Sequence, residues 1–151
     1  MPIVQITPSE EIMNKIKQQT EVWERLIIRK FQQVGEECSN QAKSLNIGTF
    51  TDRTGNLRSS IGYIIVKDGE LYSVGDFRSI KNGAKGSSEG VEYAKSLISK
   101  FPRGIALVVV AGMNYAGYVE AKSLDVITGQ ELYSSRRLKE LLTELTKNIH
   151  E

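Results

Sequence analysis

The sequence predicts an α+β fold: a long N-terminal helix packed on an antiparallel sheet of about four strands, with a short middle helix and a C-terminal helix. Three observations predict it. Apolar residues recur at helical period over the first third of the chain, Asp68-Gly69 separates two strand-like segments, and Ile105–Ala111 is a continuous apolar run of strand length. Because 151 residues is the size of one ordinary domain, we assign residues 1–151 to a single domain.

The first helix is predicted from its start signal and its apolar stripe. Thr7-Pro8-Ser9-Glu10 matches a capping box, with threonine at the N-cap and proline at the first helical position. A helix of about 35 residues would be roughly 50 Å long, which exceeds the diameter of a compact domain of this size. It therefore either breaks near Gly35 or projects and packs on another subunit, and both alternatives stay open. The stripe comprises Ile12, Ile16, Trp23, Ile27, Phe31, Val34, Cys38, Ala42 and Leu45, widened by Leu26 and Ile28.

The strands are predicted from alternation, turn residues and β-branched runs. Ile61–Lys67 and Glu70–Gly75 flank Asp68-Gly69, a pair that suits the positive φ angles of a two-residue hairpin turn. Both faces of the first strand are apolar, so we expect it to be covered on two sides. Gly104–Ala111 is expected to be a buried strand, and Leu124–Ile127 a last, edge-like strand.

The segments between and after these strands are predicted as a loop and two helices. Asp76–Gly90 is poor in apolar residues and rich in Gly, Ser and Lys, which is typical of an exposed loop. Val91–Lys100 is expected to form the short middle helix, which Pro102 ends. Thr128-Gly129-Gln130-Glu131 is a second capping box and opens the C-terminal helix, whose apolar positions are Leu138, Leu141, Leu142, Leu145 and Ile149.

The predicted loop superficially resembles a phosphate-binding loop. Its Gly83–Ser88 segment has the order Lys-Gly-Ser instead of Gly-Lys-Ser, and it lacks a glycine at the required upstream spacing. We therefore do not expect it to bind phosphate. Arg78, Lys81 and Lys85 are instead candidates for contact with an acidic partner or DNA.

Composition and charge exclude several classes of protein. No apolar segment approaches the length of a membrane-spanning helix, and no signal peptide is visible at the N-terminus, so synthesis in the cytoplasm is expected. The 20 basic and 18 acidic residues are evenly mixed along the chain. A dedicated nucleic-acid-binding protein would cluster its positive charge on one face.

The sequence offers little chemistry for catalysis. Cys38 lies on the apolar stripe without a nearby histidine or helix N-terminus to lower its pKa, so packing is its expected role. His150, the one histidine, is next to last and is expected to fray. Four tyrosines, at 63, 72, 115 and 118, favour core or interface packing over base stacking. We expect no enzymatic activity, no cofactor and no bound metal.

Two segments are more distinctive than the rest. The first is Thr54-Gly55-Asn56-Leu57-Arg58-Ser59-Ser60-Ile61, and the second is Tyr115-Ala116-Gly117-Tyr118-Val119-Glu120. In this order, with a long helix before them and a hairpin and buried strand between them, they resemble the tail-completion (neck, or head–tail joining) proteins of long-tailed bacteriophages and prophages. The shared positions are Thr54, Gly55, Leu57, Arg58, Ser60, Tyr115, Ala116, Tyr118, Val119 and Glu120.

The resemblance implies a non-enzymatic virion assembly protein. Such a protein would form a homo-oligomeric ring, with six copies as the expected number, at the head–tail junction. It would cap the tail tube or join it to the connector, with the major tail protein and the connector or head-closure proteins as partners. DNA would cross its lumen only transiently, and the protein would be made in the bacterial cytoplasm and incorporated in the virion neck.

The two motifs also suggest one internal contact. Arg58 and Glu120 are their only charged residues, and we expect them to pair and clamp the first turn onto the later segment. Two independent surface charges are the alternative. At the level of function, the alternative is a small module of prophage origin that binds nucleic acid or a host protein through the sheet and its tyrosines.

Overall fold

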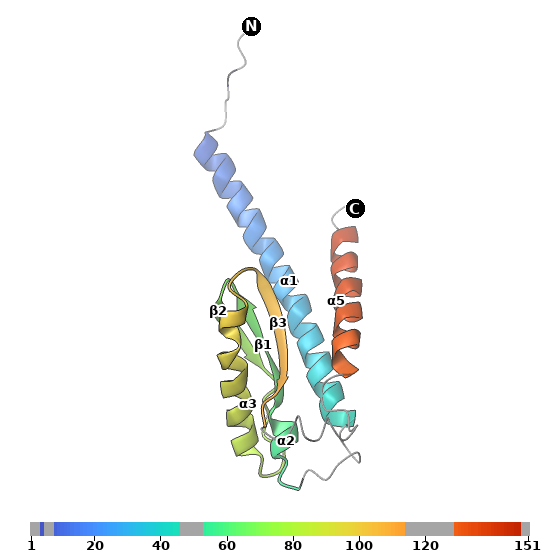
Figure 1. Cartoon of the computed structure of the whole chain (residues 1–151). Coiled ribbons are helices and arrows are strands. Elements are labelled where there is room, and N and C mark those ends of the chain that lie inside the picture. Colours follow the sequence, from blue (N-terminus) through green and yellow to red (C-terminus); the bar gives the residue numbers. More distant parts are fainter. Residues whose placement is uncertain (1–3, 5–7, 46–52, 114–128, 149–151) are drawn as a thin grey trace.

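The computed structural model describes Val4 and residues 8–45, 53–113 and 129–148, and it confirms the α+β class (Figure 1). Its helices are α1 (Ser9–Leu45), α2 (Asn56–Ser59), α3 (Ala84–Ser96) and α5 (Gly129–Lys147), with a 3₁₀ turn η1 (Ile98–Lys100). Its strands are β1 (Ile61–Lys67), β2 (Glu70–Gly75) and β3 (Ile105–Ala111). Within these ranges the sheet has three strands and not four, and the expected fourth strand, 124–127, lies outside them.

The sheet is antiparallel with the order β2-β1-β3. The predicted hairpin turn between β1 and β2 is confirmed, since Asp68 and Gly69 have φ angles of 49° and 82°. Two hydrogen bonds join this turn to the start of β3: the Asp68 amide donates to the Gly104 carbonyl at 2.8 Å, and the Gly104 amide donates to Asp68 Oδ1 at 2.9 Å. The turn therefore ties the adjoining ends of all three strands together, and the β1–β2 register shifts between Ile65 and Val66.

Strand β1 is the centre of the core, and both of its faces are covered, as predicted. Its Tyr63 and Ile65 pack with Ile28 of α1 on one face. Its Ile64 and Val66 pack with Ala94 of α3 on the other. Helix α5 lies beside α1 and antiparallel to it (Figure 1), so the fold has α1 and α5 in one layer, the sheet in the middle, and α3 alone in the outer layer.

Helix α1 runs without interruption through Gly35, so the predicted alternative of a break at this residue is wrong. Gly35 is there for a different reason. A Cβ atom at this position would lie 2.6 Å from the ring of Tyr63, which packs directly on the helix backbone. The helix consequently extends beyond the sheet, and every residue from Ser9 to Val22 is exposed to solvent (Figure 1).

The prediction of a loop over Asp76–Gly90 is wrong for its second half. Helix α3 begins at Ala84 and ends at Ser96, so the middle helix starts seven residues before the predicted Val91. Its buried residues are Gly86, Gly90 and Ala94, which are four apart on one face. The helix was missed because small residues form its contact face in place of large apolar ones.

The C-terminal helix α5 is confirmed, although its predicted N-cap, Thr128, lies outside the described residues. Leu141 of α5 is buried against Val34 and Cys38 of α1. None of the described helices combines the length and the apolar character that crossing a membrane requires.

Candidate functional site

The first motif forms a tight turn that leads into β1. Gly55 has a φ of 79°, occupies the N-cap position of α2, and places Leu57 and Ile61 in the core with full burial. Thr54, the residue before Gly55, is not the cap. Its Oγ1 atom accepts a long hydrogen bond of 3.4 Å from the amide of Asn56, the first residue of α2. The motif thus uses glycine for the backbone shape and leucine and isoleucine for anchorage.

Polar groups of the same turn bind the segment that precedes α3. Ser59 Oγ accepts a hydrogen bond of 2.7 Å from the Ile80 amide. Asn56 Oδ1 accepts one of 3.1 Å from the Gly86 amide. Because these side chains are largely enclosed, the bonds satisfy groups that water cannot reach. Together they hold the 76–90 segment against α2.

A third polar residue of the turn binds the end of β3. The Ser60 carbonyl accepts a hydrogen bond of 3.1 Å from the Gly112 amide, and Ser60 Oγ accepts one of 3.3 Å from the Met113 amide. The first motif is therefore an internal brace that joins the start of β1, the end of β3 and the start of α3.

The second motif cannot be compared with this brace. Tyr115, Ala116, Tyr118, Val119 and Glu120 all lie outside the described residues, so the pairing of Arg58 with Glu120 stays a prediction. Of the other tyrosines considered, Tyr63 is buried in the core, as expected, whereas Tyr72 on the edge strand β2 is about half exposed.

The three basic residues of the 76–90 segment differ in their surroundings. Arg78 contacts its own chain, since its Nε lies 2.6 Å from Asp76 Oδ1 and its terminal nitrogen donates to Asn40 Oδ1 at 2.7 Å. Lys85 is exposed on the first turn of α3 and lies 3.6 Å from Glu89. Lys81 is exposed in a turn with a φ of 52°. The three residues do not form one basic site, because the Arg78 guanidinium binds Asp76 and Asn40 of its own chain.

That junction contains a buried ion pair. Lys43 Nζ lies 3.1 Å from Asp76 Oδ2 and also donates a hydrogen bond to the Asp76 carbonyl. The Lys43 side chain is 7% exposed and the Asp76 side chain 1% exposed. Burial lowers the pKa of Lys43, although the neighbouring Asp76 carboxylate opposes that effect. The pair fastens the end of α1 to the segment that leaves β2.

A second ionic cluster fastens α5 to α1. Arg137 Nε lies 3.0 Å from Glu37 Oε2, and the Tyr133 hydroxyl donates to the same oxygen at 2.9 Å. Gln33 donates to the other oxygen at 3.0 Å. Burial would raise the pKa of Glu37, but the donors from Arg137, Gln33 and Tyr133 together outweigh it and lower that pKa. The charged form of Glu37 is therefore favoured in the folded protein.

We expect Glu37→Gln to lower the free energy of unfolding by about 1 kcal/mol at neutral pH, as for a partly exposed charged cluster. Because folding lowers the pKa of Glu37 from its ordinary 4.5, its contribution is present above pH 4.5 and is lost as pH falls through the folded value. The free energies of unfolding of wild type and Glu37→Gln, measured with urea, should therefore converge at acid pH. Glu140→Gln is the control, since Glu140 is about half exposed and contacts only the outer side of Arg137 at 3.3 Å. An equal loss in both variants would contradict a special role for Glu37.

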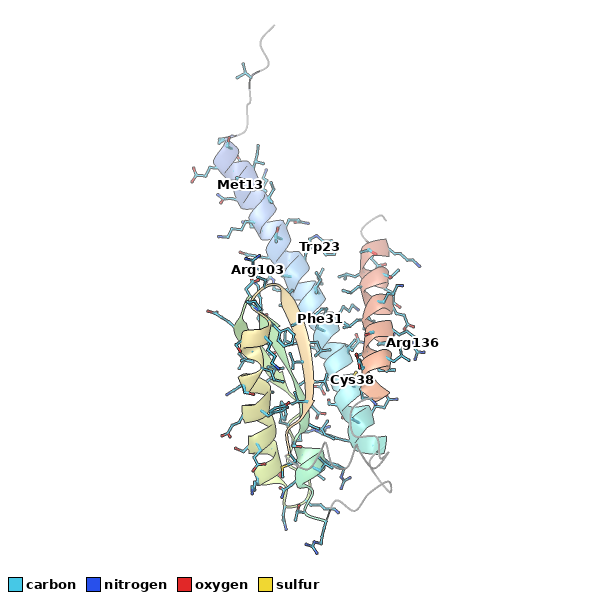
Figure 2. The ribbon with its side chains drawn as sticks, viewed as in Figure 1. Met13, Trp23, Phe31, Cys38, Arg103 and Arg136 are labelled. Carbon is cyan, nitrogen blue, oxygen red and sulfur yellow. The ribbon has the colours of Figure 1, made fainter. Side chains whose placement is uncertain are left out.

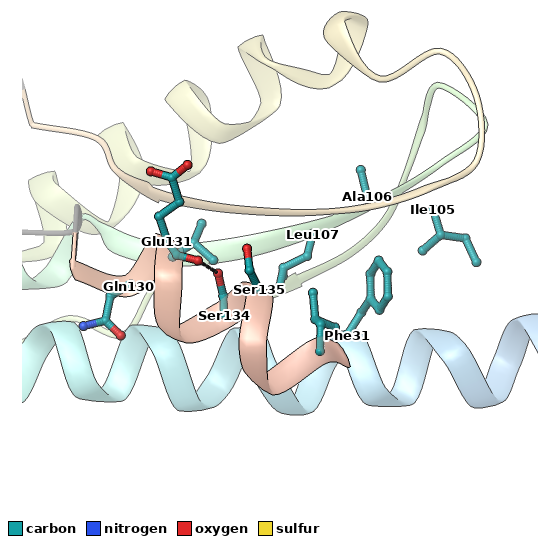
Figure 3. A pocket seen from close by; sticks show the side chains of 10 residues that line it. Phe31, Ile105, Ala106, Leu107, Gln130, Glu131, Ser134 and Ser135 are labelled. Carbon is teal, nitrogen blue, oxygen red and sulfur yellow. Dashed lines mark hydrogen bonds between the residues drawn. The ribbon is translucent and has the colours of Figure 1, made fainter. Parts of the chain in front are cut away.

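Two surface features are left without a partner inside the described chain. The first is a hollow of about 510 Å³ between β3, α1 and α5 (Figure 3), which we call the β3–α5 hollow. Its apolar wall consists of Phe31, Ile105, Ala106, Leu107, Val109 and Leu138, and its polar rim of Gln130, Glu131, Ser134 and Ser135.

The second feature is the row of apolar side chains on the projecting half of α1, which we call the projecting stripe. It consists of Ile12, Met13 and Ile16, which are 40%, 63% and 55% exposed. Met13 lies near the free end of the helix, well beyond the sheet (Figure 2). Met13 and Ile16 also line a groove of about 500 Å³ that reaches the base of the projection, where Lys67 and Glu24 form an ion pair of 2.6 Å.

The Cys38 thiol is placed for packing. Cys38 is fully buried, and burial together with the charge of Glu37 raises the pKa of its thiol to about 11. Its expected packing role is confirmed, because it contacts Val34 and Leu141. Among the residues with a described position, no three His, Cys, Asp or Glu side chains gather as metal ligands would.

Comparisons with known proteins give no independent assignment. No protein-family model matches the chain, and no curated protein and no solved structure matches it significantly.

Proposed function

We propose that this chain is a non-enzymatic virion assembly protein that acts as a ring at the head–tail junction of a long-tailed phage. In this role it caps the tail tube or joins it to the connector. The observation that carries the proposal is the projecting half of α1, which presents large apolar side chains far from the protein's own core. The motif resemblance supplies the biological setting.

The projection supports assembly for an energetic reason. Fully burying a side chain the size of Met or Ile contributes about 1.5–3 kcal/mol, and the three side chains of the projecting stripe are each about half exposed. A helix that served only its own core could end at the edge of the sheet. A partner that covers this helix would recover the missing burial, as is usual where exposed apolar residues mark interaction surfaces.

The internal brace and the charge balance support the same role. An assembly protein under mechanical load needs a rigid body behind its contact surfaces, and the first motif joins β1, β3 and α3 into one unit. The near-neutral charge, with 20 basic and 18 acidic residues, suits a lumen through which DNA passes without being held by phosphate contacts.

The test is to delete the coding sequence from its phage or inducible prophage genome and to examine lysates by electron microscopy. We expect filled heads and separate tails to accumulate, and joined particles to return when the wild-type protein is supplied. Supplying Met13→Glu/Ile16→Glu should fail to restore them, whereas Lys15→Glu, a charge change on the same exposed turns, should succeed. Normal joined particles in the deletion strain would contradict the proposal.

A further inference from the structure

The projecting stripe lies on the same side of α1 as the residues that α5 and β3 cover lower down. Phe31 is 18 residues after Met13, and Val34 is 18 residues after Ile16, which corresponds to five helical turns and about 27 Å. Val34 is fully buried against α5, and Phe31 lines the β3–α5 hollow. The apolar face that binds the sheet and α5 therefore continues upward into solvent.

The chain cannot bring its own stripe into its own hollow. Helix α1 is a single unbroken helix, so about 27 Å of rigid backbone separates Met13 from Phe31 at the hollow wall. The hollow nevertheless offers the same kind of surface, because three residues of its apolar wall, Leu107, Val109 and Leu138, also pack against the face of α1 at Val34.

The rim of the hollow also fits the polar residues that flank the stripe. The exposed Glu131 places a negative charge on this rim. Beside the stripe, Lys17 offers an ammonium group and Asn14 an amide donor. A helix seated in the hollow would thus bring donors to acceptors as well as apolar groups to an apolar wall.

We propose that the projecting stripe of one copy docks in the β3–α5 hollow of the next copy, which makes a head-to-tail contact between identical chains. This inference rests on the proposed function and specifies how the ring would be built. In this arrangement each copy gives its stripe to one neighbour and receives the stripe of another neighbour in its hollow, which makes the contact heterologous. Contacts of that type propagate around a circle and generate a closed ring when the rotation per subunit divides a full turn.

Two single-surface variants test the proposal. Met13→Glu/Ile16→Glu places charge on the stripe, and Ser135→Trp fills the hollow from an exposed rim position. In sedimentation velocity at increasing concentration, wild type should self-associate, and each variant alone should associate at least tenfold more weakly. Circular dichroism and urea unfolding check that both variants fold.

Mixing the variants tests whether the stripe of one copy binds the hollow of another. The stripe variant keeps its hollow and the hollow variant keeps its stripe, so an equimolar mixture should form a heterodimer and nothing larger. A hollow variant that associates like wild type would overturn the proposal, because the hollow would then play no part. A wild type that stays monomeric to millimolar concentration, or a folded pair that forms no heterodimer, would also overturn it. The two proposals can fail separately. If the mixture forms no heterodimer but the deletion strain accumulates unjoined heads and tails, this contact is refuted and the proposed function is not.

Discussion

Lys43→Met is expected to lower the free energy of unfolding by about 3 kcal/mol. The substitution removes an ammonium group that lies 3.1 Å from Asp76 Oδ2 and leaves a carboxylate that is 1% exposed. Breaking a buried pair by removing one partner typically costs about 3–5 kcal/mol, because the other charge stays buried without compensation. We expect the lower end of that range, since Arg78 still lies 2.6 Å from the other oxygen of Asp76.

The measurement is urea unfolding at neutral pH with a matched control. Lys15→Met removes an ion pair of similar length, 3.4 Å to Glu11, whose side chains are 70% and 53% exposed. It should change the free energy by less than about 0.5 kcal/mol. The double variant Lys43→Met/Asp76→Asn should lose less free energy of unfolding than the two single variants lose together, because neither charge is then left buried alone. A loss for Lys43→Met no larger than for Lys15→Met would contradict the structural importance of the pair.

Most of the fold followed from local physical signals in the sequence. A helical-period stripe over 30 residues, an Asp-Gly turn and a β-branched run each correspond to one backbone conformation, and α1, the β1–β2 hairpin and β3 all formed as predicted. The choice between a broken and a projecting α1 could not be made in this way. It depended on the ring of Tyr63, which is distant in sequence and needs the space that Gly35 leaves.

Helix α3 shows where local signals fail. Gly86 and Gly90 have low helix propensity and the segment has few large apolar residues, so it matches a loop by composition. The tertiary contacts override that tendency, because α3 approaches the α2 turn so closely that only glycine fits. The sequence does contain one signal for this helix, which is the spacing of its small residues. Gly86, Gly90 and Ala94 recur every four residues, as small residues do on a closely packed helix face.

The sequence indicated the first motif but not the contacts that this motif makes. The pairing of Arg58 with Glu120 stays a prediction, and the contacts that the structure describes join the first motif to the 76–90 segment and the end of β3. Hydrogen bonds that Asn56, Ser59 and Ser60 accept from backbone amides have no sequence signature, since nearly every residue supplies an amide. The Lys43–Asp76 pair was likewise invisible, because it joins two elements separated by 33 residues.

Gly86→Ala is the second substitution with a large expected effect, because α3 lies against the backbone of α2 at Gly86. A Cβ atom at position 86 would lie 2.0 Å from the Asn56 carbonyl oxygen and 2.6 Å from its carbon. These are backbone atoms of α2, so the turn or α3 has to move, and the hydrogen bond from the Gly86 amide to Asn56 Oδ1 is lost with it. Overpacking of this kind costs about 1–3 kcal/mol or more, and the lost bond adds about 1 kcal/mol.

Helix propensity works in the opposite direction and sharpens the test. Alanine favours a helix over glycine by about 1 kcal/mol, so without the α2 contact Gly86→Ala would stabilise the protein. We expect instead a net loss of about 2–3 kcal/mol in urea unfolding, with faster hydrogen exchange at the amides of α3 and at Ile80. Ser88→Ala, on the exposed face of the same helix, isolates propensity alone and should be neutral or slightly stabilising. If Gly86→Ala behaves like Ser88→Ala, α3 does not dock on the first motif, and the brace that we assign to Thr54–Ile61 does not exist.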